Sequence, residues 1–188
     1  MGQEGVPKCF YGQLTGRGTL PRTASRSCRL EDTLLAYRLP AYEGRLRVKE
    51  RRHPKLYWID SGVARAVKNQ LAMPTVKERG VLLEGLILQI VRASRDYGVV
   101  DYDELFYWST GAIEVDLLLI RGSSIIAIEI KATKRLRPEH FRGLQAIQEL
   151  KGVGRKILVY EGERQFRDDS GIEVVPVGDF FKLLAKGL

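Results

Sequence analysis

The clearest pattern of hydrophobic and polar positions lies in residues 105–131, where three short apolar segments follow one another. Turn-forming residues at positions 110–111 and 121–124 separate the segments, so the pattern predicts three consecutive strands. In the second segment, strict alternation predicts that Val115 and Leu117 point to the same face. The second and third segments are apolar on both faces, which is typical of strands buried inside a sheet.

Helical periodicity appears on both sides of these strands. Apolar spacing predicts a helix over residues 76–94 with Thr75 as a candidate N-cap, and Pro138 favours the start of a second helix that runs to about Leu150. The other expected elements are strands at 34–39, 56–59, 156–160 and 172–177, a short helix from Asp60 or Ser61 to about 69, and a closing helix at 179–186. This order predicts an α/β fold with a central mixed five-stranded sheet flanked by helices, and a parallel crossover over residues 125–160.

The composition and the periodicity of the sequence change along its 188 residues. Residues 1–29 are rich in Gly, Ser, Thr and Arg without periodicity, which predicts a loosely ordered basic arm. Residues 30–74 are expected to form a small appendage of strands and a helix, and residues 75–188 the sheet domain. A hydrophobic fraction of 44% is sufficient for a core.

Charged residues interrupt the apolar strands at Asp116, Glu129 and Lys131. Isolated charges are costly in such surroundings, so these side chains are expected to meet at one place. Glu84 lies on the apolar face of the expected helix and also needs a partner there. Two interpretations stay open at this point: a structural cluster of salt bridges, or a site with a chemical function.

The order Asp116, a polar turn, then Glu129-Ile130-Lys131 resembles the PD-(D/E)xK nuclease superfamily, which has a restriction-endonuclease-like core. Val115 stands where the signature has proline. The resemblance implies that Asp116 and Glu129 hold Mg²⁺ or Mn²⁺, and that Lys131 polarises water or stabilises phosphate charge. In the superfamily, the preceding helix often contributes an acid, which matches Glu84. The following helix sometimes contributes a glutamine, and the candidate for that role is Gln145.

A narrower resemblance extends from about residue 30 to the end of the chain. Its blocks are LEDTLLAYRLPAY, KLYWIDSGVARAV, GVLLEGLILQIV, FYWST followed by GAIEVDLLL, IAIEIKAT and GLQAIQEL. In this order they are similar to the C-terminal region of a prokaryotic group of AAA-type ATPases, in which a PD-(D/E)xK-like domain of unassigned function follows the ATPase. No G-x-x-x-x-G-K-[ST] loop occurs in the sequence, so no ATP site of that kind is expected.

The charge balance is basic, with 31 Lys and Arg against 23 Asp and Glu and a net charge of +8. This excess favours a polyanionic partner such as DNA. Two basic groups are the expected phosphate contacts: Arg45, Arg47, Lys49, Arg51, Arg52 and Lys55, then Lys134, Arg135 and Arg137. The first group could equally be a solvated loop. The apolar runs are too short to span a membrane. The two cysteines do not indicate a disulfide framework, which favours the reducing cytoplasm as the location.

Two functions from different classes therefore follow from the sequence. The first is a Mg²⁺-dependent nuclease-like domain that acts on DNA phosphodiesters. The second is a non-catalytic module that binds DNA or docks a partner, as the tail of a former AAA-type ATPase. A homodimer or a partner ATPase is compatible with either function.

Overall fold

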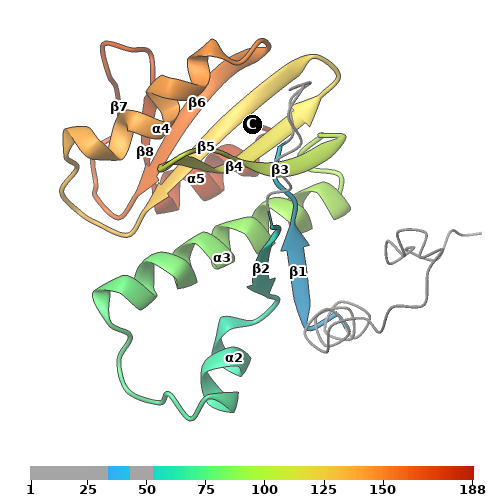
Figure 1. Ribbon diagram of the computed structural model, residues 1–188, viewed down its shortest axis with the longest axis vertical. Helices are drawn as coiled ribbons and strands as arrows, with labels where there is room; N and C mark the ends of the chain where they lie inside the picture. Colours follow the sequence, from blue (N-terminus) through green and yellow to red (C-terminus); the bar gives the residue numbers. More distant parts are fainter. Residues whose placement is uncertain (1–33, 43–52) are drawn as a thin grey trace, which may run out of the picture.

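A mixed six-stranded sheet with helices on both faces forms the body of the protein (Figure 1), in a computed structural model that describes residues 34–42 and 53–188. The strands lie in the order β3 (Glu104–Thr110), β4 (Ile113–Arg121), β5 (Ser124–Lys131), β6 (Val153–Tyr160), β8 (Glu173–Pro176) and β7 (Phe166–Arg167). The first three are antiparallel, β5, β6 and β8 are parallel, and β7 returns antiparallel. The α/β class, the mixed sheet and the parallel β5–β6 crossover are confirmed.

Five strands were expected, and the sixth is β7, whose two residues are too few to produce a periodic pattern. Strand β6 begins at Val153 rather than at 156, because Gly154 continues the strand instead of breaking it. The helix expected over residues 138–150 is divided into three short turns. These are η1 (Pro138–Phe141), α4 (Arg142–Ala146) and η2 (Ile147–Glu149), of which only α4 is α-helical.

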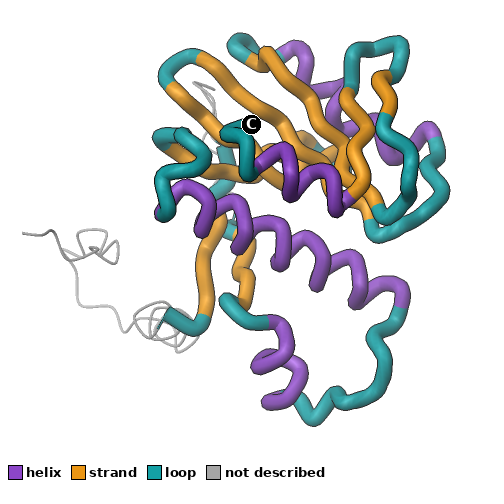
Figure 2. The backbone as a smooth tube through the Cα atoms, turned by 180° about the vertical axis from the view of Figure 1, so that it is seen from behind, coloured by secondary structure: helices purple, strands orange, loops and turns teal. Residues whose placement is uncertain are grey.

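The other helices follow the sequence pattern closely, as the tube view of Figure 2 shows from behind. They are α2 (Ser61–Val67), α3 (Val76–Asp96) and α5 (Val177–Leu184). The Asp60 side chain accepts a hydrogen bond from the Val63 backbone N–H at 2.9 Å, and Thr75 caps α3 in the same way. The cap at Thr75 is confirmed, and of the two expected start residues of α2 it is Asp60 that caps the helix. Each cap satisfies a backbone donor that has no partner inside the first turn.

The expected N-terminal appendage is a two-stranded antiparallel ribbon of β1 (Ala36–Leu39) and β2 (Lys55–Trp58), followed by α2. Strand β1 starts two residues later than expected, because Leu34 adopts a left-handed backbone with φ +57°. The chain after β1 continues to the edge of the main sheet, where the Tyr42 N–H donates to the Tyr107 carbonyl at 2.7 Å. Leu39 and Tyr57 are buried in the same core as α3, so the ribbon is part of the domain. The predicted arm 1–29 lies outside the described residues.

Apolar side chains cover both faces of the sheet. One face packs β4 and β5 against α3 and α5, with Leu88 and Phe180 fully buried between them. The opposite face packs against α4, through Leu144 and its neighbours. Burying one such side chain contributes roughly 1.5–3 kcal/mol, so the two layers hold the strand ends in fixed positions.

Strand β4 contains a β-bulge. Phe106 pairs with Leu118, yet Trp108, two residues further on, pairs with Val115, so β4 has one extra residue between these points. Val115 therefore packs on the α4 side and Leu117 on the α3 side. The expectation that these two side chains share a face is wrong, because a strictly alternating pattern assumes a regular strand.

Candidate functional site

Asp116 and Glu129 lie together where β4 separates from β5. The regular pairing of the two strands ends at Leu117 and Ile128, and beyond it the Ile130 backbone N–H donates to Asp116 Oδ2 at 2.8 Å. The side chain of Asp116 thus takes the place of a backbone acceptor at the point where the sheet opens. As whole residues, Asp116 is 7% and Glu129 5% exposed, and they are the buried charged residues of the part of the chain that the structure describes.

Glu129 makes an ion pair with Lys131 through its Oε1 atom. Its second oxygen, Oε2, is buried and has no hydrogen-bond partner among the residues described. Leaving such an atom without a partner is costly, since buried polar groups in folded proteins are nearly always hydrogen-bonded or bound to an ion. The Glu129 carboxylate therefore has an open acceptor inside the site.

Glu84 reaches the same site from the middle of α3, as expected from its place on the apolar face. Its Oε1 atom accepts a hydrogen bond from Lys55 Nζ at 2.9 Å and another from the Tyr57 hydroxyl. Lys55 also pairs with Glu114 and lies 3.6 Å from Asp116 Oδ1. Four elements therefore converge on one cluster: α3, the sheet strands β4 and β5, and β2 from the N-terminal ribbon.

Sequence reasoning missed Lys55, Tyr57 and Glu114 as members of the site. Lys55 was expected in a basic stretch that faces solvent or DNA, but its side chain is 23% exposed and surrounded by carboxylates. Its partners lie far away in the sequence, 29 residues away in the case of Glu84. The only available signal was the apolar surrounding of Lys55 in the segment KLYWI, which places it at the start of a strand.

Burial dominates the electrostatics of the cluster. It raises the pKa of Asp116 well above the ordinary value, and the negative charges of Glu129 and Glu84 raise this pKa further. Burial also raises the pKa of Glu129, against the opposing effect of Lys131. For Lys131, burial alone would lower the pKa, but the charges of Glu129 and Asp116 outweigh it and the pKa is raised. The carboxylates thus gain from any positive charge in the site, whether a proton, an ammonium group or a metal ion.

Four carboxylates share two ammonium groups here, which leaves two excess negative charges when all six groups are ionised. Carboxylate oxygens are the ligands that Mg²⁺ prefers, and the open Oε2 atom of Glu129 offers one of them. Within the described residues, no group of three such side chains is arranged so that all three could hold one metal ion. The carboxylate oxygens and their negative charges are of the kind that binds a divalent ion. The ammonium group of Lys55 lies between these carboxylates.

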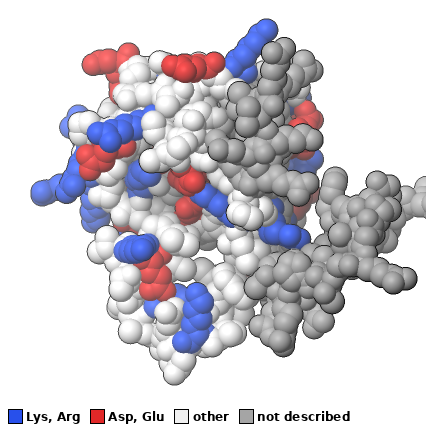
Figure 3. Space-filling view, in the orientation of Figure 1, with Lys and Arg blue, Asp and Glu red and all other residues white. Residues whose placement is uncertain are grey.

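The other predicted site residues lie apart from this cluster. Gln145 is exposed on α4, and no contact joins it to the carboxylates within the described ranges. Lys134, Arg135 and Arg137 are exposed on the loop that follows β5. The predicted basic residues between positions 45 and 52 fall outside the described residues. On the face drawn in Figure 3, basic and acidic side chains are intermixed rather than gathered into one patch.

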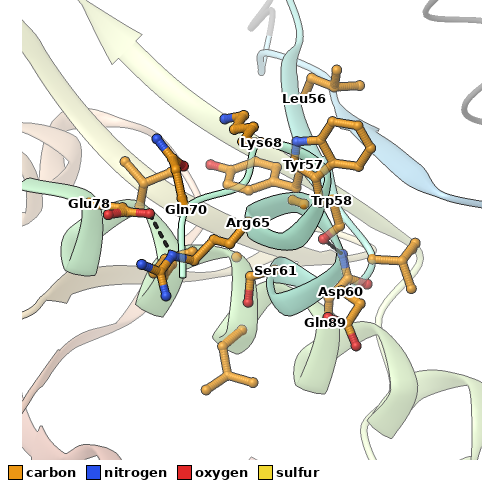
Figure 4. Close-up of a pocket in the computed structure, with 16 residues that line it drawn as sticks. Leu56, Tyr57, Trp58, Asp60, Ser61, Arg65, Lys68, Gln70, Glu78 and Gln89 are labelled. Atoms are coloured by element: carbon orange, nitrogen blue, oxygen red, sulfur yellow. Dashed lines mark hydrogen bonds and ion pairs between the residues drawn. The ribbon is translucent and has the colours of Figure 1, made fainter. Parts of the chain in front are cut away.

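A separate hollow of about 250 Å³ lies between β2, α2 and α3 (Figure 4). Tyr57 borders it while its hydroxyl contacts Glu84, and Arg65 and Glu78, which form an ion pair at 2.8 Å, also line it. Nine apolar side chains in residues 56–86, the segment that includes β2, α2 and the first half of α3, are exposed: Leu56, Ile59, Val63, Val67, Leu71, Met73, Val76, Val81 and Leu86. Exposed apolar side chains that gather on one surface are typical of an interaction face.

The fold and the site define an α/β domain with a mixed six-stranded sheet and a buried cluster of carboxylates and lysines. The chain belongs to a family described as a domain of unknown function (DUF4143), whose pattern matches residues 79–180. That domain is typical of AAA-ATPase-associated proteins. None of the described helices combines the length and the apolar character that a membrane crossing requires.

Two mycobacterial relatives, both described as uncharacterized proteins, match most of this chain. Protein Mb2031c of Mycobacterium bovis is 26% identical over 179 residues, which cover 89% of this chain and 39% of the relative, and Rv2008c of Mycobacterium tuberculosis matches to the same extent. The chain therefore spans 39% of the length of these curated relatives. The crystal structure of protein VC1899 from Vibrio cholerae aligns over 88% of this chain and 41% of its own, with 17% identity and a TM-score of 0.35.

Proposed function

We propose that this domain is a nuclease-like phosphodiester hydrolase that depends on Mg²⁺ or Mn²⁺ and has a restriction-endonuclease-like core. The observation that carries the proposal is the pair of buried carboxylates, Asp116 and Glu129, at the place where β4 and β5 separate. A purely structural cluster would match its carboxylates with ammonium groups, whereas this one has four carboxylates to two ammonium groups and an unpartnered buried oxygen on Glu129 among the residues described.

In this proposal Asp116 and Glu129 hold the metal ion, with Glu84 in support. The metal, when bound, supplies Lewis-acid chemistry by neutralising phosphate charge and making water a better nucleophile. Water attacks phosphorus and gives up a proton to solvent, the bond between phosphorus and the leaving oxygen breaks, and the leaving oxygen takes up a proton. Lys131 stabilises the negative charge that develops on the phosphate, because its ammonium group is held beside the site by Glu129. The Ile130 N–H fixes the orientation of Asp116.

Cleavage of supercoiled and branched DNA, with and without MgCl₂, tests the proposal. The parent chain is expected to cut only with the metal, and Glu129→Gln is expected to be inactive at an unchanged fold. Glu149→Gln is the matched control, since it makes the same substitution at an exposed glutamate of η2, outside the site. Equal cleavage by the parent and Glu129→Gln would mean that the activity comes from elsewhere.

A second function is favoured by the exposed apolar side chains around α2 and the start of α3. We propose as the alternative that the domain docks a partner ATPase through this surface and has no catalytic activity. Val67 and Met73 are 77% and 90% exposed in a segment with several other exposed apolar side chains, which a docked partner would bury. In that case Val67→Glu together with Met73→Glu would abolish binding to an AAA-type ATPase, while the melting temperature would not change.

A further inference from the structure

Lys55 lies within the acidic cluster although it belongs to neither the main sheet nor α3. It opens β2 in the N-terminal ribbon, and its ammonium group bonds Glu84 at 2.9 Å, pairs with Glu114 and lies 3.6 Å from Asp116. Its charge also lies 5.2 Å from the centre of the Tyr107 ring. The ammonium group therefore occupies the space between carboxylates that come from two different elements.

A lysine in this position and a divalent ion compete for the same oxygens. Asp116, which would bind the ion, has its Oδ1 atom 3.6 Å from Lys55 Nζ, which is farther than Glu84 and Glu114 but still within ion-pair distance. Two positive charges a few ångströms apart in a partly buried site repel each other strongly, because solvent screens them poorly. This repulsion weakens metal binding for as long as Lys55 stays close to Asp116.

Glu114 provides a second position for the ammonium group. It lies two residues before Asp116 on β4 and already pairs with Lys55, and its side chain is 43% exposed, whereas that of Asp116 is 10% exposed. A small movement of the lysine side chain toward Glu114 would leave the inner carboxylates free. The hydrocarbon stem of lysine is flexible enough for this movement without a change in the backbone.

We propose that Lys55 is a tethered counter-ion, which holds the empty site together and moves to Glu114 when a divalent cation binds. This inference rests on the proposed function, because it assumes that Asp116 and Glu129 bind the metal. Lys55 is then a residue that sets the affinity of the site for the metal and links metal binding to the N-terminal ribbon.

Calorimetric titration of the full chain with MgCl₂ tests this role. Lys55→Met removes the competing charge and keeps the stem, so Mg²⁺ should bind ~10-fold or more tightly than to the parent. Lys55→Arg keeps the charge and should bind Mg²⁺ as weakly as the parent. The same variants measured by thermal melting give a second readout, since Lys55→Met should be less stable without Mg²⁺ and gain more from it than the parent does.

Glu114→Gln distinguishes displacement from direct coordination. It removes the second position for the ammonium group, so it should weaken Mg²⁺ binding in the parent but not in Lys55→Met. Equal weakening in both backgrounds would make Glu114 a metal ligand and overturn the proposal. Mg²⁺ binding to the parent that Lys55→Met does not improve would overturn it while leaving the metal site intact. No Mg²⁺ binding to either protein would remove the proposed function as well.

Discussion

Helix α4 lies so close to β4 that a single methyl group should disturb the site. A Cβ atom built on Gly143 would lie 2.2 Å from the Glu114 carbonyl oxygen and 3.2 Å from Val115 Cγ2, and both neighbours are close to Asp116 in β4. Real Cβ atoms essentially never come within 3.0 Å of another heavy atom, so Gly143→Ala must push α4 and β4 apart. The obstacle is backbone, which cannot rotate away as a flexible side chain can.

The magnitude follows from two opposing effects. Overpacking of a well-packed region costs about 1–3 kcal/mol, whereas alanine in a helix is favoured over glycine by about 0.5–1 kcal/mol. The net loss of unfolding free energy should be about 1–2 kcal/mol, which corresponds to a decrease in melting temperature of roughly 2–8 °C for a chain of this size. Equilibrium unfolding in urea and thermal melting measure both quantities. The shift of β4 should also weaken the response of the protein to Mg²⁺.

Gly80→Ala is the matched control, because Gly80 also lies in a helix but has no atom within 4 Å of the added Cβ. That variant should gain stability by about 0.5–1 kcal/mol, as expected from helix propensity alone. A Gly143→Ala protein that is as stable as Gly80→Ala would refute the close packing of α4 on β4. Contact with α4 could then no longer be the reason why Asp116 is held in a fixed position.

Two further predictions concern charged residues outside the cluster. Hydrogen bonds from Arg155 lower the pKa of Glu173, so this ionised side chain stabilises the protein above its unfolded-state pKa near 4.5, and the stabilisation is lost as the pH falls through the lower folded-state value. Glu173→Gln should thus lower the free energy of unfolding by roughly 1 kcal/mol at pH 7. Urea unfolding curves of parent and variant should converge on acidification. A difference in unfolding free energy that does not change with pH would contradict the ion pair. DNA binding should be weak and salt-dependent, and neutralising a few phosphate-contacting side chains should reduce the slope of log K against log salt by about 0.9 per lost contact in a filter-binding assay; an unchanged slope would exclude these residues. The residues to replace by alanine are Lys134, Arg135 and Arg137.

Local patterns were sufficient for most of the elements. The apolar spacing of α3 and the cap at Thr75 are properties of neighbouring residues, and both are present in the structure. The same spacing placed Glu84 on the apolar face of α3, which is why its approach to the sheet could be anticipated. The meeting of Asp116, Glu129 and Lys131 followed from the cost of burying single charges in two adjacent strands.

Features that depend on contacts between distant segments could not be derived in this way. The bulge in β4 could not be predicted, because the segment is apolar on both faces and an extra residue there does not disturb any alternation of apolar and polar positions. Lys55 resembles its basic neighbours in sequence, and only the folding of β2 against α3 and β4 brings it to Glu84 and Glu114. Strand β7 pairs through two residues, which is shorter than any period that a pattern can reveal.

Melting curves with and without MgCl₂ test the central claim most directly, because an assembled metal site exists only in the folded chain. If Asp116 and Glu129 bind the ion, Mg²⁺ should raise the Tm of the parent, Glu129→Gln should abolish this increase, and Lys131→Ala should retain or enlarge it. A structural cluster of salt bridges predicts the opposite. In that case the parent would ignore Mg²⁺, and Lys131→Ala would lose about 3–5 kcal/mol of stability because Glu129 would be left buried without its partner. That second result would contradict a metal-binding site at Asp116 and Glu129.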